Sequence, residues 1–330
     1  MDRGLPDDHT VKAALALAVR APSVHNTQPW RWRIADHCVQ LYLDPARALS
    51  STDADQRDMV LSCGAALHHL RVAFAALGWS AVVHRLPSPA EPNHLATIEL
   101  VRHRPNSQDL ALSAAIPRRR TDYRHFSSWP VPPGYLGLVS ERAARLGAVV
   151  RQVSGTPREL LDDPLRDAAQ RRAEDLEKYR LELAEWSGRH GIQDDVLAGG
   201  ATRVRTDDEF PAGAFAGPQL TGEVHEPDFA ELLVLGTSGD DRQSRLCAGE
   251  ALSAVLLTAT NVGLATCVLT EPLEIPALRP QVRAAGLEGY PQALIRVGWA
   301  PTSSDPLPMT PRREIEEVLD TIDTSEATAC

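Results

Sequence analysis

The stretch RRRTDYR, residues 118–124, gathers four guanidinium groups and a threonine hydroxyl within seven positions. An arginine fork matches the oxygens of a phosphate bidentately, so this composition is suited to hold a phosphate group. The alternative is a solvated basic loop without a ligand. The groups in question belong to Arg118, Arg119, Arg120, Thr121 and Arg124.

A second polar stretch, RAPSVHNTQPWRW at residues 20–32, lies between apolar segments. Pro22 ends a helix predicted over residues 11–20, because a proline disfavours helical backbone at the residue before it. The segment that follows offers short hydrogen-bonding groups from Ser23, Asn26 and Gln28. A capped helix followed by a turn would explain the serine and the asparagine, but not the glutamine with its two neighbouring tryptophans.

The elements that would position these stretches follow an internal repeat. Residues 55–83 align with residues 240–268 at a constant displacement of 185, which pairs Gly64 with Gly249 and Gly78 with Gly263. Each copy has a polar start, a long apolar helix, a glycine that ends the helix and a β-rich stretch. The predicted helices cover 61–77 and 246–262, and the flanking strands cover 38–44, 94–101, 231–236 and 290–300. A duplication explains this match better than chance.

Strands that alternate with helices predict an α+β protein. Because the long helices are apolar on most sides, the two copies should pack on each other as a pseudo-dimer in one compact body. The predicted repeats are 1–113 and 114–330. The second contains an insertion at about 160–228, an amphipathic helix followed by a stretch rich in Gly, Asp and Pro. An insertion of this length predicts a lid, or else a loose surface segment.

The bulk composition excludes several classes of protein. A net charge of −10 and a pI of about 5.6 argue against a nucleic-acid scaffold, which needs a basic face. The apolar runs contain Ser, Thr and Asn and predict buried elements rather than membrane spans. The start lacks a secretion signal, so we expect a cytoplasmic protein. Five dispersed cysteines indicate buried or free thiols rather than a disulfide framework, and no metal-ligand spacing or catalytic triad is present.

Four motifs in chain order resemble those of the FMN-dependent nitroreductase superfamily: APSVHNTQPWRW, RRRTDYRHF, GLATCVLTEPLE and TPRREIEEVL. The exact residues of the motifs RAPSVHNTQPWRW and IPRRRTD resemble those of the Acg branch, the mycobacterial nitroreductase-like flavoproteins. The resemblance covers residues 9–319 and implies a nitroreductase-like fold with FMN as cofactor. Ordinary members are homodimers whose two FMN sites are built from both chains. A branch member is implied to imitate that dimer in a single chain with one site, as a monomer that could dimerise further.

The resemblance also implies the phosphate-binding residues. Arg119 and Thr121 match the family's Arg-x-Ser pattern, with Arg120 between them. A register shifted by one would select Arg120 and Arg124 instead. Arg312 resembles the phosphate-binding arginine near the end of family members.

Other positions match the segments that contact the rest of the flavin. Leu269, Thr270 and Glu271 match a segment whose backbone donates to the N5 side of the ring, although Pro272 stands where a glycine is usual and removes one donor. The polar stretch suits the ribityl hydroxyls and the ring edge. The implied FMN-binding set is Ser23, Asn26, Gln28, Arg119, Arg120, Thr121, Leu269, Thr270, Glu271 and Arg312.

Two functions follow from the resemblance. The first is hydride transfer from NAD(P)H through FMN to nitroaromatic or quinone-like acceptors, with no protein acid or base assigned. The second is FMN storage or sequestration under the lid, with little NAD(P)H-dependent activity, which Pro272 and the insertion favour. A flavin-free scaffold is disfavoured, because the two copies retain complementary halves of one site.

Overall fold

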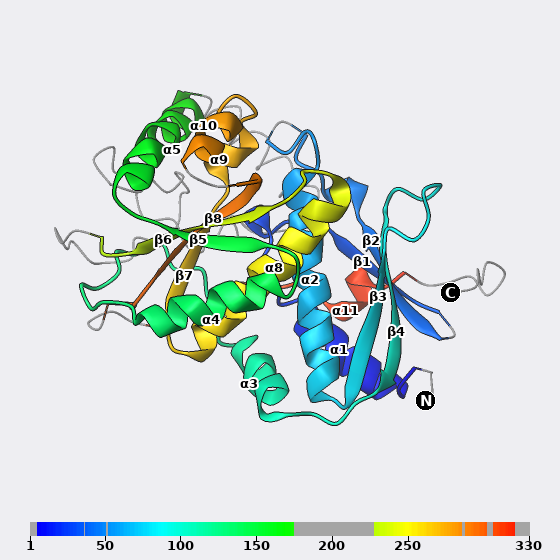
Figure 1. The fold of residues 1–330 in the computed structure, drawn as a ribbon. Helices are drawn as coiled ribbons and strands as arrows, with labels where there is room; N and C mark the ends of the chain where they lie inside the picture. The colour runs from blue at the N-terminus through cyan, green and yellow to red at the C-terminus, as the bar shows by residue number, and fades with distance from the viewer. Residues whose placement is uncertain are drawn as a thin grey trace.

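The computed structural model describes residues 5–35, 37–50, 52–174, 228–285, 288–301 and 306–320. Two antiparallel four-stranded sheets lie on either side of two long helices (Figure 1). The first sheet has the order β1-β2-β4-β3 and consists of β1 Trp30–Ile34, β2 Cys38–Leu43, β4 His94–Arg102 and β3 Trp79–Arg85. The second has the order β5-β6-β8-β7 and consists of β5 Val149–Val153, β6 Glu231–Thr237, β8 Tyr290–Gly298 and β7 Ala265–Leu269. The matching orders confirm the predicted α+β class with two repeats.

The two central helices, α2 (Arg57–Ala76) and α8 (Arg242–Asn261), cross in close contact. A Cβ atom at Gly64 would lie 2.1 Å from a carbonyl oxygen of α8, and one at Gly249 would lie 2.0 Å from a carbonyl oxygen of α2. Only glycine permits this approach. Because these glycines are related by the displacement of the repeat, the crossing lies on the pseudo-two-fold axis between the repeats.

A second contact marks the same axis. Nδ1 of His68 lies 2.8 Å from Oγ of Ser253, a residue 185 positions away. Gly78 and Gly263 end the two helices in the left-handed region, with φ of +89° and +87°. The two repeats therefore pack as the pseudo-dimer that the sequence predicts.

The remaining helices cover the ends of this core. They are α1 Asp8–Ala18, α3 Ser107–Ala115, α4 Pro133–Ala144, α5 Thr156–Glu174, α9 Glu271–Glu274, α10 Arg279–Ala284 and α11 Ile315–Val318, with 3₁₀ turns η1 Val24–Asn26 and η2 Pro45–Arg47. Helix α1 begins earlier than predicted, because the carboxylate of Asp7 accepts from the backbone N–H of Thr10 and caps it. Residues 160–174 of the predicted insertion belong to α5. The rest of the predicted lid, residues 175–227, lies outside the described residues.

The last described residues return to the first sheet. Leu319 forms a parallel bridge with Trp32, and the backbone N–H of Asp320 donates to the carbonyl of Trp32 at 2.8 Å. Thr121 forms a parallel bridge with Thr266 of β7, within the second repeat. The first sheet therefore holds a segment that the sequence assigns to the second repeat.

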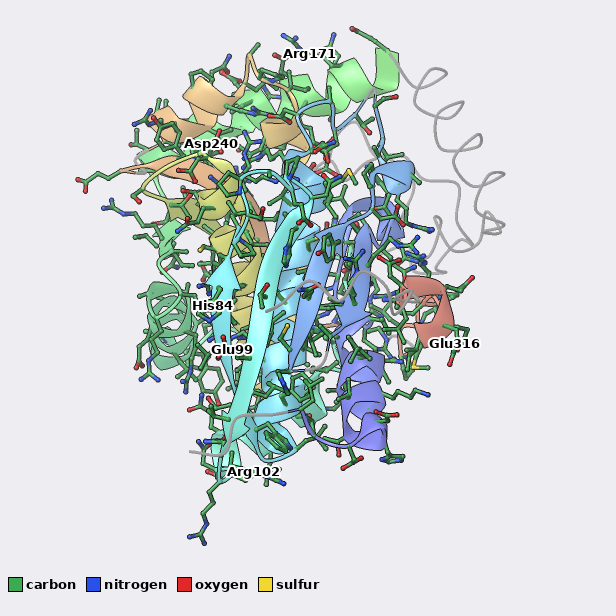
Figure 2. All side chains as sticks on the ribbon, turned by 90° about the vertical axis from the view of Figure 1, so that its right-hand side faces the viewer. His84, Glu99, Arg102, Arg171, Asp240 and Glu316 are labelled. Carbon is green, nitrogen blue, oxygen red and sulfur yellow. The ribbon has the colours of Figure 1, made fainter. Side chains whose placement is uncertain are left out.

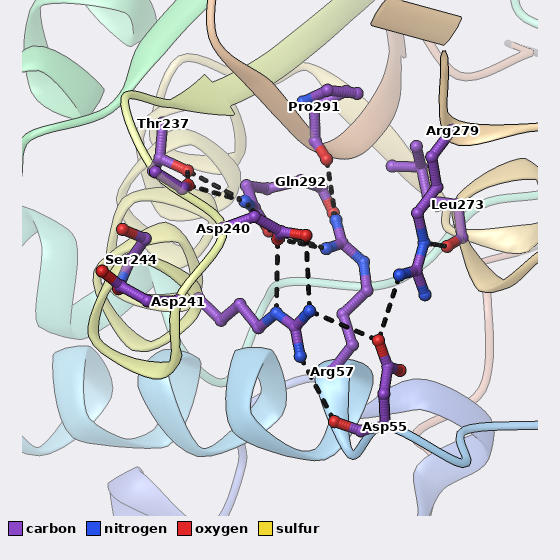
Figure 3. A network of polar contacts seen from close by, with 12 residues as sticks. Asp55, Arg57, Thr237, Asp240, Asp241, Ser244, Leu273, Arg279, Pro291 and Gln292 are labelled. Carbon is purple, nitrogen blue, oxygen red and sulfur yellow. Dashed lines mark hydrogen bonds and ion pairs between the residues drawn. The ribbon is translucent and has the colours of Figure 1, made fainter. Parts of the chain in front are cut away.

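A polar network joins the starts of α2 and α8 (Figure 3). The buried guanidinium of Arg57 donates to Oδ1 of Asp240 at 3.2 Å and to Oε1 of Gln292 at 2.9 Å. Arg245 contacts Asp240 and Asp55, both at 3.3 Å, and Arg279 donates to Asp55 at 3.0 Å. We call these residues the interface network.

The outer face of the first sheet is polar. Nε2 of His84 on β3 lies 3.3 Å from Oε1 of Glu99 on β4, on the face turned toward the viewer in Figure 2. By length and composition α2 could cross a membrane, but 83% of its apolar window is buried inside the molecule. It therefore serves as a core helix.

One expectation about the cysteines is wrong. Cys38 is disulfide-bonded, whereas Cys63, Cys247 and Cys267 are free. A single bridge between dispersed cysteines leaves no spacing signal, which is why the sequence did not indicate it.

Candidate functional site

Four arginines from three parts of the chain lie close enough to repel one another. We call them the arginine cluster: Arg20 after α1, Arg119 and Arg120 after α3, and Arg312 before α11. Burial, and then repulsion by Arg120 and Arg20, lowers the pKa of Arg119 to about 10. Burial and repulsion by the other three lower the pKa of Arg312 to about 9. At these pKa values Arg119 and Arg312 still carry their charge at neutral pH.

No carboxylate of the described residues forms an ion pair with the arginine cluster. The Nε atom of each member is buried without a hydrogen-bond partner there. Arg119 is 6% exposed, and its Nε atom has no hydrogen-bond partner among the described residues. Burying an unpaired cation costs several kcal/mol, by order of magnitude, so such groups are normally matched by an anion. The positive charge of the cluster is therefore not balanced by the described residues.

Backbone carbonyls hold two members of the cluster, and a methionine sulfur holds a third. Nη1 of Arg312 donates to the carbonyls of Thr310 and Pro311 at 3.2 and 3.0 Å. Nη1 of Arg120 donates to the carbonyl of Pro117 at 2.8 Å. Nη2 of Arg20 lies 3.2 Å from the sulfur of Met309. The guanidinium groups are thus positioned before any ligand arrives.

Residues 23–28, which we call the polar stretch, lie against the segment that carries Arg312. Nδ2 of Asn26 donates to the carbonyl of Pro311 at 3.2 Å. Oε1 of Gln28 accepts from the backbone N–H of Arg313 at 2.9 Å. Gln28 is 2% exposed, so it braces the C-terminal segment from within. The structure therefore brings the predicted Asn26 and Gln28 beside the segment of the predicted Arg312.

The backbone of the polar stretch is strained. His25, Asn26 and Gln28 have φ of 51°, 54° and 51°, in the left-handed region that favours glycine. Each such residue costs on the order of 1–3 kcal/mol, and such strain collects at functional sites. Oγ of Ser23 accepts from the backbone N–H of Gln28 at 2.9 Å and holds the turn closed.

The predicted segments of the second repeat lie at two places along β7. Thr121 pairs with Thr266 inside the strand, whereas residues 269–271 form its junction with α9. At this junction, Oγ1 of Thr270 donates to Oε1 of Glu274 at 2.8 Å. Arg124 differs from the arginine cluster, because its guanidinium pairs with Asp122 at 2.7 Å.

A small pocket with room for about one water molecule lies between the polar stretch and α9. We call it the acid pocket. Its lining includes Val24, His25 and Thr27 from the polar stretch, Asp53 and Asp58 at the start of α2, and Glu274 of α9. None of the residues predicted to contact the flavin lines this pocket, although Val24, His25 and Thr27 alternate with them along the chain.

Sequence reasoning missed Arg20 and the carboxylates of the pocket. Arg20 lies three residues before the polar stretch. An arginine near the end of a helix is common in any case, because its charge interacts favourably with the helix dipole. Asp58 in the first turn of a helix is equally ordinary. Only its position in a helix that is apolar on nearly every side could have drawn attention.

No family model matches the chain. It is 50% identical to Rv3131 of Mycobacterium tuberculosis (strain ATCC 25618 / H37Rv) over 325 residues, which cover 97% of this chain and 94% of the relative. It is 39% identical to Acg of the same strain over 322 residues, with 94% and 95% covered. The names of both relatives assign them to the NAD(P)H nitroreductases.

Among solved structures, the FMN-dependent nitroreductase NfnB of Mycobacterium smegmatis in complex with NADPH is similar at 18% identity and a TM-score of 0.42, covering 66% of this chain and 100% of that one. The FMN- and NADPH-dependent NfnB of a Sphigopyxis strain gives 20% identity and a TM-score of 0.40, with 64% and 98% covered. Sequence identity over nearly the full length of both relatives carries the conclusion: the chain belongs to the nitroreductase family, in the group that contains Acg and Rv3131.

Proposed function

We propose that the chain binds FMN and passes electrons from NAD(P)H to small nitroaromatic or quinone-like acceptors. The observation that carries this proposal is the arginine cluster, four cations without an anion among the described residues. The names of the relatives and of the NfnB structures support the choice of ligand and reductant.

The arginine cluster fits the phosphate of FMN. A phosphate monoester presents a dianion with three acceptor oxygens, and guanidinium groups bind such oxygens with short, charge-assisted hydrogen bonds. Arg119 and Arg312 are the proposed main contacts, with Arg20 and Arg120 completing the positive field. The pairing of Arg124 with Asp122 favours the register that selects Arg119.

The polar stretch and the β7–α9 junction fit the remainder of the ligand. Asn26 presents an amide beside the segment of Arg312, and the hydroxyl of Ser23 remains able to donate while its oxygen accepts from Gln28. Residues 269–271 are proposed to contact the ring through backbone groups. When bound, FMN would supply the capacity to accept and release a hydride, while the chain binds and orients.

The test is an anaerobic absorbance trace of FMN-loaded protein mixed with excess NADPH, and separately with NADH. Fast bleaching of the flavin band with either nucleotide is expected. A band that persists with both nucleotides but bleaches with dithionite would contradict the oxidoreductase and favour FMN storage. Protein that retains no FMN after reconstitution would contradict both functions.

A further inference from the structure

Met309 is an exposed methionine whose sulfur contacts a member of the arginine cluster. Nη2 of Arg20 donates to Sδ of Met309 at 3.2 Å, although the two residues lie 289 positions apart. Met309 is nevertheless 61% exposed. The segment before α11 that carries it also carries Arg312, so the contact ties Arg20 to that segment.

Exposure sets Met309 apart from the other described methionine. Met59 is 3% exposed and belongs to the apolar core. Peroxide dissolved in water oxidises a methionine to the sulfoxide where it can reach the sulfur. Of the methionines in the described ranges, Met309 is therefore the one open to this reaction.

The partner of Met309 contributes to the positive field of the arginine cluster. Burial first, and then repulsion that includes Arg20, lowers the pKa of Arg119, Arg120 and Arg312. The Nε atom of Arg20 is buried without a hydrogen-bond partner among the described residues. A group that binds Arg20 more strongly than the present sulfur would therefore weaken the field that the cluster offers to an anion.

Oxidation would turn the sulfur into such a group. A thioether is a weak hydrogen-bond acceptor, so Met309 orients Arg20 without offsetting much of its charge. The sulfoxide is polar, and its oxygen is bonded directly to the sulfur that Arg20 already contacts. A hydrogen bond from a guanidinium to this oxygen is stronger than one to a thioether, because the donor is charged and the acceptor is polar. The sulfoxide would thus compete with a phosphate for Arg20.

We propose that Met309 is an oxidation site through which hydrogen peroxide weakens phosphate binding at the arginine cluster. This inference rests on the proposed function, because the phosphate concerned is that of FMN. The step balances. A lone pair of the sulfur forms a bond to one peroxide oxygen and the O–O bond breaks. The second oxygen leaves as hydroxide and becomes water with the proton of the first, so sulfur loses the two electrons that peroxide gains.

The test compares FMN binding before and after peroxide. The protein without ligand is treated until mass spectrometry shows Met309 as the sulfoxide, the peroxide is removed, and FMN is titrated by its fluorescence. We expect the dissociation constant to rise about fivefold, because one charge-assisted hydrogen bond is partly lost. Methionine sulfoxide reductases, which restore the thioether, should return the original affinity.

Two substitutions at the same position separate oxidation from other damage. Met309→Leu keeps an apolar side chain of similar size but has no sulfur. It should bind FMN within about twofold of the unmodified protein, both before and after peroxide. Met309→Gln presents an amide oxygen in place of the sulfoxide oxygen and should bind FMN about fivefold more weakly without any peroxide. Because Met309 is largely exposed, both variants should fold.

The leucine variant also accounts for the cysteines, the other targets of peroxide. Burial raises the pKa of Cys63, Cys247 and Cys267, which keeps these thiols protonated and slow to oxidise. A loss of FMN affinity after peroxide that Met309→Leu shares in full would place the effect at another residue and overturn the proposal.

A third variant tests whether the effect passes through Arg20. Arg20→Ala should bind FMN more weakly from the start, and oxidation of Met309 should then change its affinity by less than about twofold. A further fivefold loss in this variant would show that the contact between Met309 and Arg20 is not the route. The proposal would then be wrong.

Failure of the proposal and failure of the proposed function give different results. Unchanged FMN affinity after full conversion of Met309 overturns the proposal alone, as does a Met309 that resists a peroxide excess able to oxidise free methionine. If the untreated protein binds no FMN, the proposed function fails, and the same series is measured with inorganic phosphate by calorimetry. Weaker phosphate binding after oxidation, seen only with Arg20 present, supports the oxidation site, whereas unchanged or absent phosphate binding overturns it.

Discussion

The interface network and the arginine cluster both gather arginines inside the molecule, but only the first provides its own counter-charges. In the interface network every cation meets an anion: Arg57 contacts Asp240, Arg245 contacts both aspartates, and Arg279 contacts Asp55 (Figure 3). In the arginine cluster no described carboxylate pairs with any member. The charges of the first arrangement are balanced within the described residues, whereas those of the second are not.

The two regions also differ in position within the pseudo-dimer. The interface network joins corresponding places in the two repeats, since Asp55 and Asp240 are partners at the displacement of 185. The arginine cluster combines unlike parts, one from each end of the chain and one from its middle. The interface network stabilises the pairing of the repeats, whereas the arginine cluster is the proposed ligand site.

The largest expected effect lies in the interface network. Replacing Arg57 by Ala removes hydrogen bonds to three neighbours and leaves Asp240 with less compensation. We expect a loss of roughly 3–5 kcal/mol in the free energy of unfolding, the usual cost of removing one partner of a buried ion pair. Urea denaturation measures it. A loss below about 1 kcal/mol, within the range of surface ion pairs, would show that the network is not a structural element.

The double variant Arg119→Ala/Arg312→Ala should act in the opposite way. We expect FMN affinity to fall by more than about 2 kcal/mol, or roughly 30-fold, as charge-assisted phosphate bonds are lost. Stability without ligand should not fall, because two mutually repelling cations are removed. Fluorescence titration and urea denaturation give the two numbers. Unchanged affinity would refute the assignment of the phosphate site.

The smallest expected effect is at Arg124. Its charge is balanced by Asp122, so Arg124→Ala should change FMN affinity by no more than about 0.5 kcal/mol. The same fluorescence titration measures it, with Arg119→Ala as the matched comparison. A loss as large as that of Arg119→Ala would instead support the shifted register of the arginine-rich motif.

The sequence predicted those elements whose signals are local or repeated. Helices α2 and α8, the strands β2, β4, β6 and β8, and the closing glycines Gly78 and Gly263 all appear where periodicity and the repeat placed them. Strand β1 was missed, because its residues follow the polar stretch and its pairing with β2 is a tertiary event. The boundary of the repeats at 113/114 and the lid stay predictions.

The candidate site was predictable only in part, because it depends on segments far apart in sequence. The motifs pointed to Arg119 and Arg312, but Arg312 meets Arg20 because the C-terminal segment returns to β1 through Leu319. The raised pKa of Asp58 likewise depends in part on the charge of Glu274 from the other repeat. No local sequence pattern reveals contacts between residues that lie so far apart along the chain.

The most direct test of the arginine cluster compares FMN with riboflavin, which lacks the phosphate. The protein without ligand is titrated with each flavin, followed by flavin fluorescence, and the titration is repeated with Arg119→Ala. If the cluster is a phosphate site, FMN binds at least about 30-fold more tightly than riboflavin, corresponding to about 2 kcal/mol, and Arg119→Ala removes most of the difference. Equal affinity for both flavins in the unmodified protein would contradict it.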